Sequence, residues 1–380
     1  MSEDRSRWLM LFIALLSSSS FLFSMQIVPP VLPTLIEVYD VSNARASNLM
    51  SFIALPGVFL SILGGAFVNK YGTKIIGLTG LILVSVGTLI FALSSSFLSL
   101  EMSRLIIGVG GTFLIVAMPA LLTQYFAQRE MGLAMGIHGL NMPLATLVSF
   151  NLLGITQIIY GWQAPFFIAF IICMAALSIF SLFVKEEYKE RTNLSFSGIK
   201  NGQIWLLGLV WATFNMAIIS FLTWSPKLFM DFWGLDPAKS AFTSSMFMVG
   251  SLITPLTGYL SDRIRKRRLL MMLSALGMTL SFLFLPSISV EALVPATILF
   301  GLVVAFVPPM IFSIPSKIMD SKNIGLGFGV LNACLGIGIF LGPFVVGLVM
   351  DMIYDKILVF FTMAIFALSS LLLTLVLKER

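Results

Sequence analysis

The sequence is poor in charged residues, cysteine and histidine. Only 11% of its 380 residues are charged, whereas 58% are hydrophobic. A soluble domain carries roughly 25% charged residues, so the composition and the mean hydropathy of +1.02 indicate an integral membrane protein. The two cysteines, Cys173 and Cys334, both fall in apolar runs. They are interpreted as inert buried thiols, which excludes a disulfide framework.

Motifs for enzymatic chemistry are also absent. The sequence has no Walker-type phosphate loop, no His/Cys spacing typical of a metal site and no soluble nucleotide-binding region. We therefore predict that the protein is not an enzyme and has no cofactor or metal, so that any transport is driven by a gradient or uncoupled. The pI is 9.4, but the basic residues lie in short loops between apolar runs, which argues against nucleic-acid binding.

Twelve apolar stretches are long enough to cross a bilayer as helices. They fall at 8–36, 45–68, 75–95, 98–126, 131–158, 164–184, 202–230, 239–261, 268–286, 291–316, 324–350 and 357–377. The first is too long for a cleavable signal peptide and is interpreted as a span. The longest polar segment follows the sixth stretch. This pattern predicts an all-α membrane protein with twelve transmembrane helices in two six-helix bundles, 1–187 and 201–380, joined by a linker at 188–200.

The loop charges predict the orientation. Of the 23 Lys and Arg residues, 18 fall on the side that holds both termini and 4 on the opposite side. Cytoplasmic loops carry the excess of Lys and Arg. We therefore predict a multi-pass protein of the cell membrane with both termini in the cytoplasm.

A charged turn occurs twice at an offset of 193 residues, as GAFVNKYGTK at 65–74 and GYLSDRIRKRR at 258–268. The aligned pairs are Gly65 with Gly258, Asn69 with Asp262, and Lys70 with Arg263. The same offset pairs glycines in later spans, for example Gly108 with Gly301. Since glycine lets membrane helices approach closely, matching glycines predict matching helix contacts in two halves of equal orientation.

These motifs resemble those of the major facilitator superfamily over essentially the whole chain. The superfamily's loop signature, Gly-x-x-x-Asp-Arg-x-Gly-Arg-Lys, is matched by Gly258, Asp262 and Arg263, although Arg265 stands where glycine is usual. A run from Arg104 to Gly111 resembles its second signature, whereas the antiporter-type Gly-Pro pair of the fifth span is absent. The resemblance implies alternating access between two six-helix bundles around a central cavity, and it does not name the cargo.

The resemblance also implies a cytoplasmic gate. It places Asp262 beside the start of the fifth span at 131–132, where a carboxylate meets the positive end of a helix dipole. Asn69 is uncharged and can only hydrogen-bond at the equivalent site near Gly325. We therefore expect an asymmetric lock, in which the Asp262 contact is the stronger of the two. The gating residues are then Gly65, Asn69, Lys70, Gly258, Asp262 and Arg263. The alternative is that these charges only set the topology.

Two basic side chains are candidates for recognising a charged solute. Arg104 lies well inside a span, where a charge is costly. It either pairs with Glu101, three residues earlier, or faces the cavity and attracts an anion. The single histidine, His138, lies in the fifth span and suits a proton relay or an anion contact. Its alternative role is that of a packing residue.

Four amide side chains in spans are further candidates for substrate contacts. They are Gln26, Asn141, Asn215 and Asn332. Each would be costly facing lipid, so each either binds substrate or hydrogen-bonds a neighbouring helix. Trp211 and Trp224 could shape the cavity, but packing against lipid explains them equally.

The spans lack a central Asp or Glu, which cationic-drug exporters commonly need. A cavity with Arg104 and His138 but no carboxylate favours an anionic or neutral small molecule. We therefore predict a secondary transporter of a small organic or inorganic anion, with a possible coupling proton, working as a monomer in the lipid bilayer. The alternative is a multidrug or amphipathic-compound exporter, favoured by 34 Phe and 22 Met. A non-transporting sensor would need a signalling domain or long tail, and the sequence shows neither.

Overall fold

The computed structural model describes residues 3–126, 130–185, 201–264, 266–319 and 324–377, and these described residues form helices and turns without a strand. For 3–5, 65, 69, 261–264, 316–317 and 324 the backbone alone is described. The first half of the chain forms the predicted spans one to six. Its helices are α1 (Glu3–Gln26), α2 (Val28–Tyr39), α3 (Asn43–Leu93), α4 (Phe97–Tyr125), α5 (Met131–Gly139), α6 (Asn141–Val148), the π-helix η1 (Ser149–Leu153), α7 (Gly154–Tyr160) and α8 (Ala164–Phe183).

The second half forms spans seven to twelve. Its helices are α9 (Gly202–Trp233), α10 (Pro237–Ser251), α11 (Thr254–Ile264), α12 (Arg267–Phe284), the short 3₁₀ turns η3 (Leu285–Ser287) and η4 (Val290–Ala292), α13 (Leu293–Val304), α14 (Val307–Ser313), α15 (Pro315–Ile318), α16 (Ile324–Met352) and α17 (Lys356–Val376). The spans are therefore less regular than the apolar runs suggest.

Prolines account for most of the irregularity. A proline lacks the N–H that would bond to the carbonyl four residues earlier, so helices kink or end there. The break between α1 and α2 precedes Pro29, the break between α10 and α11 precedes Pro255, and that between α13 and α14 precedes Pro308. Within α3, Gly72 has a φ of 82° and divides the second span from the third, because a residue without Cβ adopts this conformation readily.

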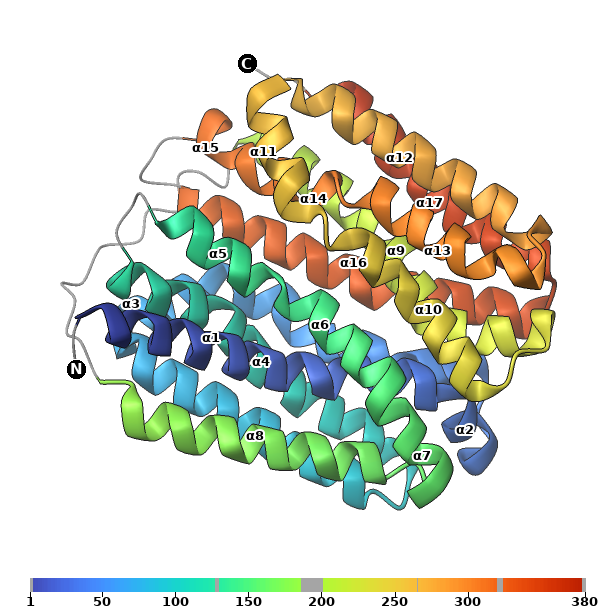
Figure 1. Ribbon diagram of the computed structural model, residues 1–380, viewed down its shortest axis with the longest axis horizontal. Coiled ribbons are helices and arrows are strands. Elements are labelled where there is room, and N and C mark those ends of the chain that lie inside the picture. Colours follow the sequence, from blue (N-terminus) through green and yellow to red (C-terminus); the bar gives the residue numbers. More distant parts are fainter. Residues whose placement is uncertain (1–2, 127–129, 186–200, 265, 320–323, 378–380) are drawn as a thin grey trace.

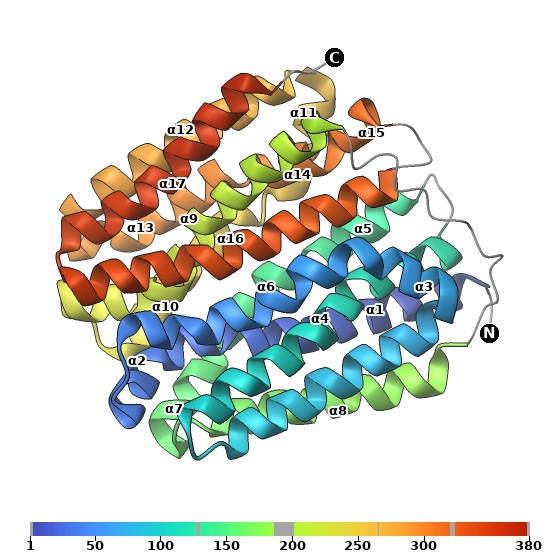
Figure 2. The same ribbon diagram turned by 180° about the vertical axis from the view of Figure 1, so that it is seen from behind.

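The two halves lie side by side as two helical bundles. In Figure 1 the blue-to-green helices occupy the lower half of the molecule and the yellow-to-red helices the upper half, and Figure 2 shows the same division from behind. Both ends of the chain lie at one end of the bundle, which we call the terminus end. The other end, which carries the turns between α9 and α10 and between α16 and α17, is called the opposite end.

Matching glycines hold equivalent crossings in the two halves. A Cβ on Gly108 of α4 would clash with the carbonyl of Ile53 in α3, and a Cβ on Gly301 of α13 would clash with the carbonyl of Phe247 in α10. Ile53 and Phe247 lie at nearly the same 193-residue offset as the glycines. The repeat in the sequence thus places the second span against the fourth in the same way as the eighth against the tenth.

Aromatic clusters fill the interior of each half. In the second half Phe300 packs edge-on against Phe282, with centroids 4.8 Å apart, and against Phe247 at 5.0 Å. In the first half Phe91 stacks on Phe166 at 4.1 Å. Edge-on and offset pairs of this kind contribute about 0.5–1.5 kcal/mol each beyond the area they bury. Aromatic pairs therefore help to fill the interior of both halves, within one apolar core that continues from one half into the other.

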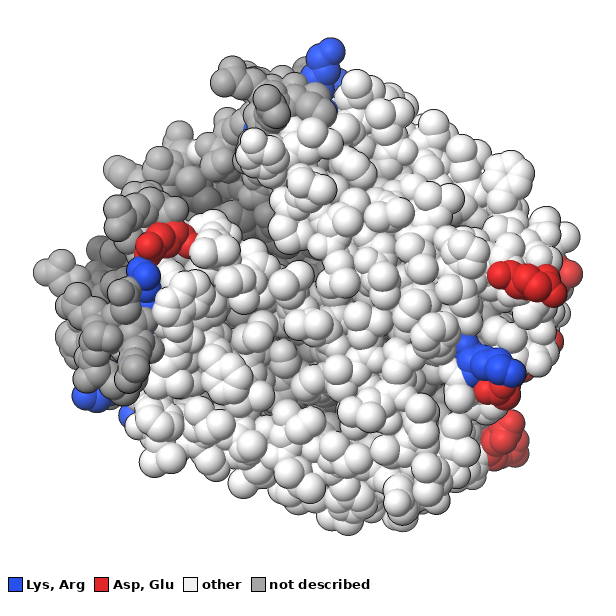
Figure 3. All heavy atoms as spheres, viewed as in Figure 1, with Lys and Arg blue, Asp and Glu red and all other residues white. Residues whose placement is uncertain are grey.

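The all-helical membrane fold is confirmed. Eleven segments of the described chain are long and apolar enough to cross a membrane, and the predicted eighth span is present as α10 and α11, which are separated at residues 252–253. Figure 3 shows why a bilayer suits the surface: in this view the described Lys, Arg, Asp and Glu residues gather near the two ends, with an uncharged band between them. The predicted linker, 188–200, lies outside the described residues.

Candidate functional site

A cavity of about 680 Å³ lies between the two halves. Helices of the first half (α1, α3, α4, α5 and α6) and of the second half (α9, α10, α11, α13, α14 and α16) all contribute to its wall. Pro143, Pro255, Pro308 and Pro309 are among the lining residues, so the fifth, eighth and tenth spans are interrupted where they face the cavity. Irregular backbone at membrane depth is tolerated where it lines a cavity, because lipid cannot satisfy its polar groups.

The cavity extends toward the terminus end. Ser61 near the end of the second span, Met135 in α5, Gly258 in α11 and Phe312 in α14 all line it. At the opposite end the halves touch directly. Ser51 of α3 donates to the carbonyl of Phe340 at 2.7 Å. The structure therefore shows a conformation closed at the opposite end.

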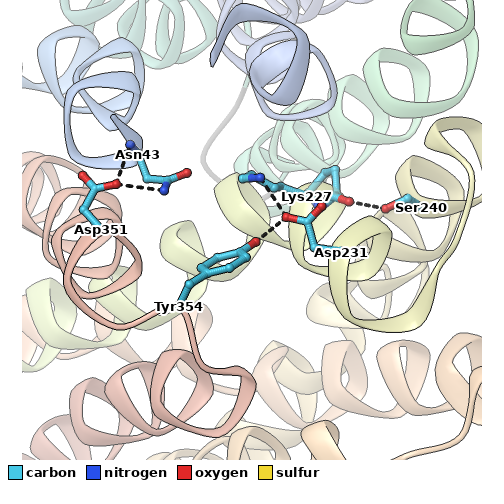
Figure 4. Close-up of polar contacts among 7 residues, drawn as sticks. Asn43, Lys227, Asp231, Ser240, Asp351 and Tyr354 are labelled. Atoms are coloured by element: carbon cyan, nitrogen blue, oxygen red, sulfur yellow. Dashed lines mark hydrogen bonds and ion pairs between the residues drawn. The ribbon is translucent and has the colours of Figure 1, made fainter. Parts of the chain in front are cut away.

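A contact of three hydrogen bonds at the closed end is made by Asp351 in the last turn of α16. Its carboxylate accepts hydrogen bonds from the backbone N–H and from the side-chain amide of Asn43, both at 2.8 Å (Figure 4). It also accepts one from the backbone N–H of Ala44 at 2.7 Å. The two backbone N–H groups belong to the first turn of α3, where backbone donors lack intrahelical partners and the helix dipole is positive. We call this contact the Asp351 latch.

The turn that follows the latch is held by a second cluster in the same half (Figure 4). Lys227 pairs with Asp231 at 2.7 Å, and Tyr354 donates to the same carboxylate. Burial and the neighbouring Asp231 raise the pKa of Tyr354 above its ordinary value, so its hydroxyl stays a donor. The cluster therefore anchors the segment between α16 and α17 against α9.

A third contact between the halves joins the fifth span to the eighth. Asn151 in η1 donates to Ser245 of α10 at 2.9 Å and to the carbonyl of Leu147 at 2.8 Å. The fifth and eighth spans are thus bonded together at a point between the cavity and the opposite end.

Arg104 lies beside the cavity but outside its wall. It is 0% exposed, and it donates to the carbonyls of Leu49 at 2.6 Å, Ser24 at 2.6 Å and Met25 at 3.5 Å. The Met25 carbonyl is free because Pro29, four residues later, has no N–H. Glu101 binds Asn48 at 2.8 Å instead. The guanidinium thus ties α1 to α3, and neither arrangement expected from the sequence is seen in this conformation.

His138 and Gln26 also lie next to the cavity wall. The Nε2 atom of His138 and the Ser18 hydroxyl form a hydrogen bond of 2.9 Å, which joins α5 to α1. Gln26 is buried and donates to the sulfur of Met142 at 3.2 Å, while its Oε1 has no hydrogen-bond partner among the described residues. Met142 itself lines the cavity. Asn141 begins α6 between two lining residues, Leu140 and Met142.

Asn215 and Asn332 are the two predicted substrate residues that line the cavity. Asn215 donates to the carbonyl of Trp211 at 2.7 Å. Trp211 also lines the cavity, with Ser61, Thr112, Ser251 and Thr254 as further polar groups. None of the described lining residues is charged. The sequence held one signal for this wall, namely the prolines at 143, 255, 308 and 309, since interrupted spans point to a central site.

The predicted gating residues lie at the terminus end. Gly258 lines the cavity, and a Cβ there would lie 3.4 Å from Pro309. Lys70 is exposed, with its ammonium 5.0 Å from the ring centre of Tyr71. Gly65 and Asn69 belong to α3, and Asp262 and Arg263 to α11, but their side chains lie outside the described residues. The asymmetric lock stays a prediction.

The comparisons with known proteins agree with this architecture. A family model described as "Major Facilitator Superfamily" matches residues 14–343 and 229–380. A "Nitrite extrusion protein" of Bacillus subtilis is 22% identical over 349 residues, covering 88% of this chain and 85% of its own length. A "Lysosomal dipeptide transporter MFSD1" of Danio rerio is 21% identical over 344 residues, covering 83% and 74%.

A solved structure shares the fold. It is a bacterial homolog of the human lysosomal transporter Spinster, described as inward-facing and occupied, with a TM-score of 0.76, 14% identity, and coverage of 97% of this chain and 93% of that one. The duplicated six-span halves, the cavity between them and the family match lead to one conclusion: the chain belongs to the Major Facilitator Superfamily and is a membrane transporter.

Proposed function

We propose that this transporter carries a small anionic solute by alternating access, as residues 1–187 rock against 201–380. The observation that supports an anion is the charge beside the cavity. Arginine side chains keep their positive charge in proteins. Among the described residues, no carboxylate forms an ion pair with the Arg104 guanidinium. Two of its hydrogen bonds go to the backbone of α1, where Met25 lines the cavity, and one goes to Leu49 of α3. In a low-dielectric interior such a charge attracts anions beyond contact distance.

The relatives support the same class of solute. Nitrite is an anion, and so is sulfoacetate, the solute named for a 22% identical relative of Cupriavidus necator. A dipeptide is a zwitterion that presents a carboxylate beside its ammonium group. Identities of 21–22% support the class of solute and do not select one solute for this chain.

The proposed orientation makes this conformation inward-facing. The excess of Lys and Arg at the terminus end supports a cytoplasmic location of that end, and the cavity extends toward it. The protein then resides in the cell membrane as a monomer, and the Asp351 latch closes its outer face. A proton is the proposed coupling ion, with the His138–Ser18 pair as the titrating element at the wall.

The test is transport in liposomes that contain the purified protein. We expect uptake of labelled nitrite or of a small carboxylate, accelerated by a pH gradient. A His138→Gln variant should transport without the pH dependence. Uptake equal to that of protein-free liposomes for every anion tested, under either gradient direction, would refute the anion assignment.

The alternative, export of amphipathic compounds, is favoured by the cavity wall. Phe21, Met25, Met135, Phe247 and Met248 line it, and such side chains adapt to varied apolar surfaces. Thermal-shift measurements separate the two functions. A lipophilic cation such as tetraphenylphosphonium should raise the melting temperature of an exporter, whereas carboxylates should raise that of an anion carrier.

A further inference from the structure

Trp211, a residue of the cavity wall, carries a buried hydrogen-bond donor that no described residue accepts. The residue is 6% exposed, it lines the cavity, and its Nε1 is buried without a hydrogen-bond partner among the described residues. A buried indole N–H usually has a partner, because leaving a buried donor unpaired is costly. An acceptor from outside the chain would remove that cost.

The ring is held in place by its neighbours. Phe214 stacks on it with a centroid distance of 5.3 Å and an interplanar angle of 12°, and Phe312 meets it edge-on at 5.5 Å. The indole therefore has little freedom to turn toward a protein acceptor, and its N–H keeps one direction.

Other indoles in the same half are satisfied by the protein. Trp224 donates to the carbonyl of Pro343 at 3.0 Å, and Trp233 donates to the carbonyl of Ile288 at 2.9 Å. Neither lines the cavity. Of these three residues, the one with the unpaired indole is thus the one that lines the cavity.

The remaining wall indicates what kind of molecule brings the acceptor. The cavity of about 680 Å³ is in the size range of pockets for organic ligands rather than of a three-atom ion. Phenylalanine and methionine from both halves line it, and the only side-chain amides among its described lining are Asn215 and Asn332. Such a wall buries an apolar body and leaves few polar groups to orient it.

We propose that the solute is an organic anion with an apolar body, whose charged oxygen accepts the hydrogen bond from Trp211 while the body packs between the Phe and Met side chains of the two halves. This inference rests on the proposed function, since it narrows the anion to one chemical class. Arg104 then favours the negative charge through space, and Trp211 fixes its position.

The test measures binding of phenylacetate, benzyl alcohol and nitrate to the purified protein by calorimetry. We expect phenylacetate to bind at least tenfold more tightly than either benzyl alcohol, which lacks the charge, or nitrate, which lacks the apolar body. Trp211→Phe keeps an aromatic ring and removes the N–H. It should weaken phenylacetate binding about tenfold, because hydrogen bonds to charged groups are among the stronger ones, and should leave benzyl alcohol binding nearly unchanged.

Trp233→Phe is the matched control, because it removes an indole donor that lies outside the cavity wall. Its phenylacetate affinity should equal that of the wild type, and the melting temperature of each variant reports whether it folds. Nitrate binding as tight as phenylacetate binding, or a folded Trp211→Phe variant with unchanged phenylacetate affinity, would overturn the inference and leave the anion transporter intact. Failure of the wild type to bind or transport any anion would instead refute the proposed function.

Discussion

Arg104 combines a structural and an electrostatic role in one side chain. Its three carbonyl acceptors lie on α1 and α3, so it fastens the helix that breaks at Pro29. The same position leaves its charge without a carboxylate partner among the described residues beside the cavity. Stability and anion attraction therefore depend on different properties of the residue, namely its donors and its charge.

Substituting Arg104 separates those two properties. Arg104→Met should lower the free energy of unfolding by about 2 kcal/mol or more, because buried carbonyls lose their donors, and should weaken anion binding about tenfold. Arg104→Lys keeps the charge and loses the planar fork, so we expect a similar loss of stability with most of the affinity retained. Thermal melting and calorimetry give the two readouts. Normal anion binding by a folded Arg104→Met protein would show that this charge does not set the preference.

At the scale of the helix, glycine position decides how closely two spans approach. Gly108 and Gly301 each face a carbonyl of the neighbouring helix, whereas an added Cβ on Gly132 of α5 would meet nothing within 4 Å. The sequence repeat contains all three glycines, yet the structure gives them different physical consequences.

Alanine at these sites tests the crossings. Gly108→Ala and Gly301→Ala should each destabilise the protein by about 1–3 kcal/mol, as expected for overpacking against backbone. Gly132→Ala should be neutral or slightly stabilising, since alanine favours a helix over glycine by about 1 kcal/mol. The measurement is the melting temperature in one detergent. Equal melting temperatures for all three variants would contradict the crossings described above.

At the scale of the whole molecule, the Asp351 latch joins the halves at the end where the cavity is closed. Its donors belong to the first turn of α3 and its acceptor to the last turn of α16. A rocking motion that opens this end has to break all three hydrogen bonds. The latch therefore biases the resting protein toward the conformation seen here.

Removing the latch should shift that balance. Asp351→Ala is expected to populate the conformation open at the opposite end, since it removes one charge and three hydrogen bonds from the closed one. Spin labels at Val38 and Ile353, both exposed at this end, should report a longer distance. The native Cys173 and Cys334 are buried and react slowly with the label.

Asp355→Ala is the control for this experiment. Asp355 lies in the same turn but accepts from Leu358 within its own half at 2.9 Å. Its loss should cost about 1 kcal/mol of stability, as for a helix N-cap, without changing the label distance. Identical distance distributions for Asp351→Ala and the wild type would show that the latch does not hold the end closed.

The sequence by itself determined the class of the protein, its spans and its duplication. Apolar runs long enough to cross a bilayer leave few alternatives to a membrane helix, because an unpaired backbone is too costly in lipid. The glycine pairs at an offset of 193 residues likewise predicted the matching crossings. Repeats and apolar length are local properties, so they can be read without knowing which helices meet.

Only the tertiary structure decided which polar residues face the cavity. Asn215 and Asn332 line it, whereas four other candidates lie behind or beside the wall, namely Arg104, His138, Gln26 and Asn141. Trp211 also lines it, although the sequence left open whether this residue faces the cavity or packs against lipid. In a soluble helix the apolar stripe identifies the buried face. In a membrane bundle both lipid and interior are apolar, so the direction in which a side chain points depends on helix rotation and on neighbours far away in the chain.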